Sequence, residues 1–156
     1  MREIRREALV PHSAHRMFDL IERVEDYPQF LPWCTGTQLI ERTDELVSAT
    51  VEVGVRELNV RVTTRNRKRA PEYMEIALEG GSFRHFHGEW TLRPLGPKGC
   101  HVTFVLRYEL ALHAESLAGR WIDHAADRMV DAFVQRAETV FATPPVTPSA
   151  GTDTST

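Results

Sequence analysis

The strongest constraint on the fold is a helical pattern that runs from Glu115 to Phe141. At about 100° per residue, its apolar side chains fall on one stripe. The members of this stripe are Ala118, Ile122, Ala125, Met129, Ala132, Phe133 and Val140, with Trp121 at its edge. The pattern predicts one long amphipathic helix that lies on a core.

Arg136 falls near the middle of this apolar stripe. A cation in such a place needs a partner, a polar cavity or a route for its side chain to reach water. We expect Arg136 either to form a buried ion pair or to hydrogen-bond the head group of a ligand.

Between Thr37 and Leu110, apolar residues recur mainly at every second position, which is the period of a β-strand. The clearest strand is Cys100 to Leu110, and the same alternation marks Val47 to Val55 and Tyr73 to Glu79. One apolar face per strand is typical of an antiparallel sheet that is covered on one side only. A weaker alternation predicts a first strand from Glu3 to Val10.

The segment from Arg56 to Lys68 is also predicted to be a strand, although it is polar over much of its length. A row of arginines, Arg61, Arg65, Arg67 and Arg69, falls on one of its faces. Such a row could bind phosphate, or it could be a solvated outer face beside acidic residues of neighbouring strands. We prefer the solvated face.

A short helix is predicted after the first strand, because Ser13 is a suitable N-cap and apolar residues follow at helical spacing. Tyr27 to Trp33 is then either a turn that seals the core or the rim of a pocket. The order of elements is strand, helix, helical turn, a run of about six strands and a long helix, which favours the α+β class. If the helix does not fill the curved sheet, the space between them becomes an apolar cavity.

The chain is long enough for one compact domain, which we place at residues 1–142. Residues 143–156 are rich in Pro, Thr, Ser and Gly and are predicted to be a disordered tail. The net charge of −3 gives no reason to expect DNA binding. The N-terminus is charged and no apolar run could span a membrane, so we expect a cytoplasmic protein.

Motifs of hydrolytic or metal chemistry are not found in the sequence. It contains no nucleophile elbow, Gly-rich phosphate loop or zincin motif, and Cys34 and Cys100 have no metal-ligand spacing. His85 and His87 could chelate a metal, but they are expected to face solvent. We predict no catalytic residue, cofactor or metal site, although a cyclase would need little beyond a shaped cavity and one or two acid–base groups.

Two stretches carry a resemblance to a known family. Asp26 to Gly36 (DYPQFLPWCTG) resembles the segment after the first helix in the coenzyme Q-binding and ribosome-association-toxin family of START-like proteins, which are also described as polyketide cyclase/dehydrase and lipid transport proteins. Gly81 to Leu92 (GSFRHFHGEWTL) is similar to that family's G-x-F-K/R-x-L-x-G-x-W-x-F strand, with Phe86 and Leu92 in place of its leucine and phenylalanine. The resemblance runs from about Ile4 to Phe141, and it implies the helix-grip fold, a curved antiparallel sheet wrapped around a long C-terminal helix.

The resemblance implies non-enzymatic binding of a hydrophobic molecule, most simply ubiquinone or a related isoprenoid lipid, by a carrier or chaperone that supports respiration. Such a carrier would contact membranes transiently. The expected cavity wall is Phe30, Trp33, Phe83, Phe86, Trp90, Phe104, Trp121, Met129 and Phe133, with Arg136 as the polar contact. The alternatives are a toxin-like inhibitor that contacts the large ribosomal subunit through Arg61, Arg65 and Arg67, or an aromatic polyketide cyclase.

Overall fold

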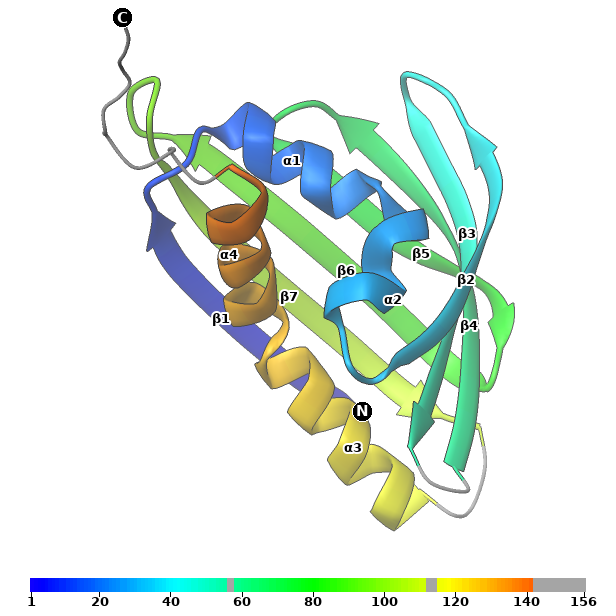
Figure 1. Cartoon of the computed structure of the whole chain (residues 1–156). Coiled ribbons are helices and arrows are strands. Elements are labelled where there is room, and N and C mark those ends of the chain that lie inside the picture. Colours follow the sequence, from blue (N-terminus) through cyan, green and yellow to red (C-terminus); the bar gives the residue numbers. More distant parts are fainter. Residues whose placement is uncertain (56–57, 112–114, 142–156) are drawn as a thin grey trace, which may run out of the picture.

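A seven-stranded antiparallel sheet with helices on one face makes up the fold (Figure 1). The computed structural model describes residues 1–55, 58–111 and 115–141. The elements in chain order are β1 (Arg2–Val10), α1 (Ala14–Glu22), the 3₁₀ turn η1 (Val24–Asp26), α2 (Tyr27–Phe30), β2 (Cys34–Arg42), β3 (Leu46–Val55), β4 (Leu58–Arg69), β5 (Tyr73–Gly81), β6 (Phe83–Pro94), β7 (Cys100–Leu110), α3 (Glu115–Asp127) and α4 (Met129–Val140). This order confirms the predicted α+β class and the run of six strands after the first helices.

The strands are arranged in the order β1-β7-β6-β5-β4-β3-β2, so the first strand joins the last one. β1 pairs with β7 from Arg2 opposite Tyr108 to Val10 opposite Cys100. The sheet curves around the helices (Figure 1). In β7 the alternation predicted from the sequence is confirmed, because Val102, Phe104 and Tyr108 are buried while Arg107 is exposed.

The N-terminal helical segment closes one end of the sheet. Ser13 caps α1, since its side-chain oxygen accepts a hydrogen bond from the backbone N–H of Arg16 at 3.2 Å. The apolar side of α1, Ala14, Met17, Phe18, Leu20 and Ile21, is buried. After η1, the short helix α2 leads to the first residues of β2.

The C-terminal helical segment differs from the prediction of a single helix, because it consists of α3 and α4 with a break at Arg128. The backbone N–H of Arg128 is shared between the carbonyl oxygens of His124 at 3.1 Å and Ala125 at 3.3 Å. Both helices contact β1, but their other contacts differ. Asp123 and Asp127 of α3 form ion pairs with arginines of β1, whereas α4 packs against α1.

The corner between β5 and β6 depends on a glycine. Gly81 has a φ of +117°, and a Cβ placed there would lie 2.2 Å from the carbonyl oxygen of Arg61. The same carbonyl oxygen accepts a hydrogen bond from the N–H of Ser82 at 2.7 Å. A side chain at residue 81 would therefore disturb the pairing of β4 with the end of β5.

Residues 143–156 lie outside the described part of the chain, so the predicted tail and the domain limit at residue 142 stay predictions. Within the described ranges, no helix is long and apolar enough to cross a membrane. The same ranges contain no cluster of three or more His, Cys, Asp or Glu residues that could hold a metal ion.

Candidate binding cavity

An apolar cavity of about 110 Å³ lies between the inner face of the sheet and the helices. An engineered apolar cavity of about 150 Å³ in another protein binds benzene, so this space is of the size of one aromatic ring. Its walls come from η1, α2, five strands and the two C-terminal helices. The lining residues are Val24, Tyr27, Trp33, Ala49, Val51, Val53, Val62, Thr64, Asn66, Ile76, Phe83, Phe86, Trp90, Phe104, Leu106, Ile122, Ala125, Ala126, Met129 and Phe133.

Seven of the ten residues predicted to line a cavity do line it: Trp33, Phe83, Phe86, Trp90, Phe104, Met129 and Phe133. Several of them also pack on one another as ordinary core. The ring centroids of Trp90 and Phe104 are 4.5 Å apart, and those of Trp90 and Phe133 are 5.3 Å apart. The aromatic wall is therefore held rigidly by its own contacts.

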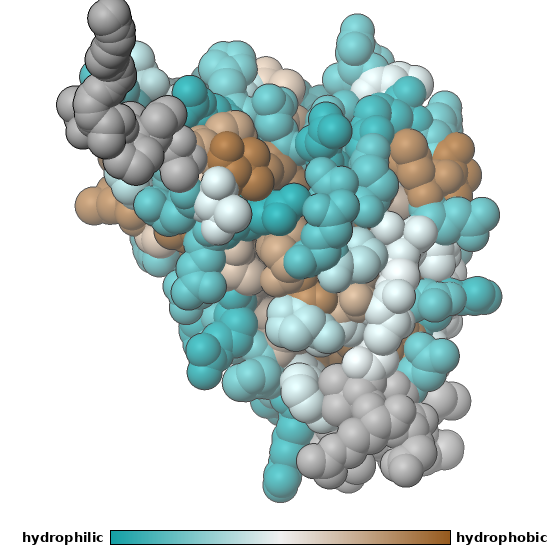
Figure 2. Space-filling model, viewed as in Figure 1, coloured by the Kyte–Doolittle hydropathy of each residue, from teal (hydrophilic) through white to brown (hydrophobic). Residues whose placement is uncertain are grey.

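Phe30 and Trp121 lie outside this cavity and line a surface groove between α2 and the C-terminal helices. Trp33 and Ala125 line both the groove and the cavity, so they form part of the wall between the two spaces. The helical face of the molecule is mainly hydrophilic, with small separate apolar patches (Figure 2).

Arg136 also lies outside the cavity wall. Its guanidinium carbon is 5.1 Å from the centre of the Phe30 ring, and its Nη2 donates a hydrogen bond to Gln29 Oε1 at 3.0 Å. No carboxylate of the described residues forms an ion pair with Arg136, so the prediction of a buried ion pair is wrong. A stacking ring and an amide oxygen contact the cation instead, while its Nε is buried without a hydrogen-bond partner among the described residues. The hydrogen bond to a ligand head group stays a prediction.

Two polar residues in the cavity wall were not identified from the sequence. Thr64 and Asn66 follow Val62 along the inner face of β4, and both are buried. Asn66 Nδ2 lies 3.8 Å from Met74 Sδ, while Asn66 Oδ1 is buried without a hydrogen-bond partner among the described residues. The period of two could have placed both side chains inward, but the neighbouring arginines gave the strand the appearance of a solvated one.

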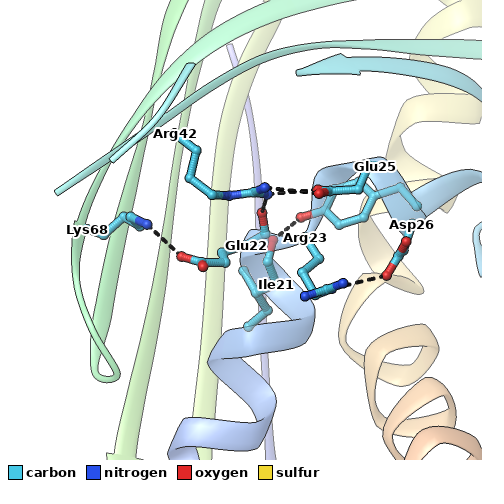
Figure 3. Close-up of polar contacts among 8 residues, drawn as sticks. Ile21, Glu22, Arg23, Glu25, Asp26, Arg42 and Lys68 are labelled. Carbon is cyan, nitrogen blue, oxygen red and sulfur yellow. Dashed lines mark hydrogen bonds and ion pairs between the residues drawn. The ribbon is translucent and has the colours of Figure 1, made fainter. Parts of the chain in front are cut away.

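A cluster of charged residues lies next to this polar part of the wall, where α1 and η1 meet β2 and β4 (Figure 3). Lys68 Nζ is 2.7 Å from Glu22 Oε1. Arg42 contacts both carboxylate oxygens of Glu25, at 2.7 and 2.9 Å, and donates to the carbonyl oxygen of Glu22 at 2.8 Å. The hydrogen bond from Arg42 is the main reason why the pKa of Glu25 is lowered to about 2.

The cavity wall has little capacity for acid–base chemistry. Among the described residues that line it, none is Asp, Glu, His, Lys, Arg or Cys. Tyr27 is the one group there with an acidic proton, and burial raises its pKa above the ordinary value. Its hydroxyl donates to the carbonyl oxygen of Ile21. The described wall therefore offers mainly shape and apolar contact.

The outer face of β4 carries the predicted row of arginines, and Arg61, Arg65 and Arg67 are all exposed. Arg65 Nη1 is 3.8 Å from Glu41 Oε1. In the strand register Arg61 lies opposite Glu52, and Arg67 lies opposite Glu75. The row therefore has acidic neighbours on both adjacent strands.

The predicted histidine pair lies on this outer side of the sheet as well. His87 Nε2 is 3.1 Å from Glu75 Oε2, and His85 Nε2 is 3.9 Å from Glu109 Oε1. The two rings therefore contact different carboxylates, on β5 and on β7.

The sequence matches known proteins over most of its length. Residues 10–134 match the family described as polyketide cyclase / dehydrase and lipid transport. The ribosome association toxin RatA of Pseudomonas aeruginosa is 39% identical over 139 residues, which cover 88% of this chain and 96% of that protein. The mitochondrial coenzyme Q-binding protein COQ10 homolog B of Xenopus laevis is 25% identical over 140 residues, which cover 83% of this chain and 55% of that protein.

Solved structures agree with this assignment at the level of the fold. A START superfamily protein from Mycobacterium smegmatis superposes with a TM-score of 0.71 at 20% identity, and the match covers 88% of this chain and 98% of that one. The curved sheet with C-terminal helices is thus the helix-grip arrangement. The chain belongs to the polyketide cyclase / dehydrase and lipid transport family.

Proposed function

We propose that this protein binds an apolar ring-bearing molecule of the ubiquinone class in its cavity and acts on it as a carrier or chaperone, without catalysis. The observation that carries the proposal is the apolar cavity of about 110 Å³ with its aromatic wall. Burial of an aromatic ring against such a wall is favourable by the hydrophobic effect. The lack of carboxylate, imidazole or amine groups in the described wall favours binding over a cyclase reaction.

The volume of the cavity limits which part of the ligand can be bound inside it. A space of the size of one ring cannot also hold a long isoprenoid chain. The ring would therefore occupy the cavity, and the chain would extend beyond it. A respiratory role is supported by the distant likeness to the coenzyme Q-binding protein, and transient membrane contact would follow from the nature of such a ligand.

Lipid analysis of the purified protein tests this proposal. Solvent extraction followed by mass spectrometry should find a co-purifying quinone or related lipid. Short-chain ubiquinone added to the purified protein should quench tryptophan fluorescence, since Trp33 and Trp90 line the cavity. The absence of any extracted lipid together with no quenching would overturn the proposal.

We propose ribosome association as a second candidate function, because a relative with 39% identity over nearly its whole length is named a ribosome association toxin. The exposed row Arg61, Arg65 and Arg67 has the charge needed to contact ribosomal RNA. This row and the cavity lie on opposite faces of the same sheet, so the two functions do not compete for one surface.

Sedimentation with large ribosomal subunits tests this second candidate. Binding should be measurable at low salt and weaken as salt is raised. Replacing Arg61, Arg65 and Arg67 by Glu should abolish it. The matched control replaces Arg5, Arg84 and Arg93 by Glu, which changes the charge equally at exposed positions on other strands. If the wild type does not co-sediment at low salt, or if both triple variants lose binding equally, this candidate fails.

A further inference from the structure

Asn66 is the most deeply buried amide of the cavity wall, with 6% of its surface exposed. It lies on the inner face of β4, opposite Val47 of β3 and Ile76 of β5. Its side-chain oxygen has no hydrogen-bond partner among the described residues. A buried carbonyl oxygen without a donor is costly, so its presence in an otherwise apolar wall needs an explanation.

The orientation of this amide follows from its other contact. Asn66 Nδ2 lies 3.8 Å from Met74 Sδ. A thioether sulfur has no hydrogen to give and can only accept, so the NH₂ group belongs on the Met74 side. The amide oxygen is then left as a free acceptor in the wall. Lys68, two residues further along the same face, directs its ammonium to Glu22 Oε1 at 2.7 Å, and Asn66 Oδ1 receives no hydrogen bond from it.

The cavity wall therefore combines a small polar patch on β4 with aromatic side chains from other elements. Thr64 is the neighbour of Asn66 on the inner face of β4, and both line the cavity. Trp90 lies opposite Met74, the residue that Asn66 contacts, so an aromatic ring of the wall is close to this patch. A ligand that fits such a wall has an apolar ring with a hydrogen-bond donor at one side.

We propose that Asn66 Oδ1 accepts a hydrogen bond from a ring hydroxyl, so that the cavity selects the hydroquinone form of its ligand over the quinone form. This inference rests on the proposed binding of a ring in the cavity. A hydroquinone presents an O–H to the amide oxygen, whereas a quinone presents a carbonyl oxygen, and two acceptors repel each other. The protein discriminates between the two forms, and no electron transfer is involved.

Calorimetric titration under anaerobic conditions tests the selection, with durohydroquinone and duroquinone as the probes. The two share one carbon skeleton, and their ring methyl groups block addition of thiols and amines. The wild type should bind durohydroquinone more tightly than duroquinone. Asn66→Leu should lose about tenfold in affinity for durohydroquinone and keep its affinity for duroquinone. The control variant Asn59→Leu makes the same change at an exposed position of β4 and should behave as the wild type.

The outcomes separate the inference from the function on which it rests. If the wild type binds neither probe, ring binding itself fails and the inference falls with it. If it binds both probes equally, or prefers duroquinone, the inference is overturned while ring binding stands. A preference for durohydroquinone that survives in Asn66→Leu also overturns it. The variant should melt no lower than the wild type, because it replaces an unpaired buried oxygen by carbon.

Discussion

Lys68 Nζ lies 2.7 Å from Glu22 Oε1, and this contact joins the inner face of β4 to the last residue of α1. The Lys68 side chain is 5% exposed and that of Glu22 is 23% exposed. The lysine is thus the partner that cannot reach water. This asymmetry decides which substitution is the more damaging.

Glu22→Gln should lower the free energy of unfolding by about 3 kcal/mol, since it leaves a buried ammonium without a counter-charge. Lys68→Met should cost only about 1 kcal/mol, because the remaining carboxylate is partly solvated and the methionine fills the same space. Urea unfolding measures both, and Glu109→Gln, at the exposed pair with Arg84, is the control, with an expected loss below about 1 kcal/mol. Equal losses for the first two variants would contradict the asymmetry.

Acid should weaken the contact between η1 and β2 within a defined pH range. The hydrogen bond from Arg42 lowers the pKa of Glu25 from 4.5 to about 2. Because the folded-state pKa is the lower one, this carboxylate stabilises the fold above pH 4.5, and the stabilisation is lost as the pH falls towards 2. The difference in unfolding free energy between wild type and Glu25→Gln should therefore shrink over that range.

The same substitution in an Arg42→Gln background is the control for this pH effect. Without the guanidinium, Glu25→Gln should change the unfolding free energy by a much smaller amount across the range. Denaturant titrations at several pH values provide the measurement. An unchanged pH dependence in that background would assign the effect to another group.

Two adjacent glycines should respond very differently to alanine. Gly81→Ala should lower the unfolding free energy by at least about 2 kcal/mol, because φ is +117° and the new Cβ would lie 2.2 Å from the Arg61 carbonyl oxygen. Gly80→Ala should stay within about 0.5 kcal/mol of the wild type, since nothing lies within 4 Å of its Cβ position. Thermal unfolding of the pair is a direct comparison, and similar melting temperatures would refute the close approach.

Filling the cavity should stabilise the protein and remove its binding capacity. Ala126 is 2% exposed and lines the cavity from α3. Ala126→Leu should raise the unfolding free energy by about 1 kcal/mol and abolish quenching by short-chain ubiquinone. Ala132→Leu makes the same change beside the surface groove and should keep the quenching. If Ala126→Leu still binds the quinone, the cavity is not where the ring is held.

The sequence predicts the sheet well because each strand has one apolar face, and the apolar residues of Cys100 to Leu110 leave little choice of orientation. It also places most of the cavity wall, since large aromatic residues on inward positions must meet the helices. The break at Arg128 could not be predicted. The apolar stripe continues through it, and neither proline nor glycine marks the bend.

The polar contacts are harder to predict because they join residues far apart in the chain. The partners of Lys68 and Arg136 are 46 and 107 residues away. No periodicity encodes such pairs, and the expected ion pair of Arg136 is replaced by Gln29 and the ring of Phe30. The place of Asn66 in the cavity wall is hard to predict for a different reason. The exposed arginines on either side of it dominate the local composition.

The alternation of side chains along β4 affects how the sequence of this protein can evolve. Its odd-numbered arginines face outward, and Val62, Thr64 and Asn66 face the cavity. A single-residue replacement on this strand therefore alters either the charge of the outer surface or the selectivity of the interior, and leaves the other intact. Selection can act on the outer charge and on the cavity lining separately. Relatives that share this strand can therefore differ in the residues that line the cavity while they keep the same charged outer face.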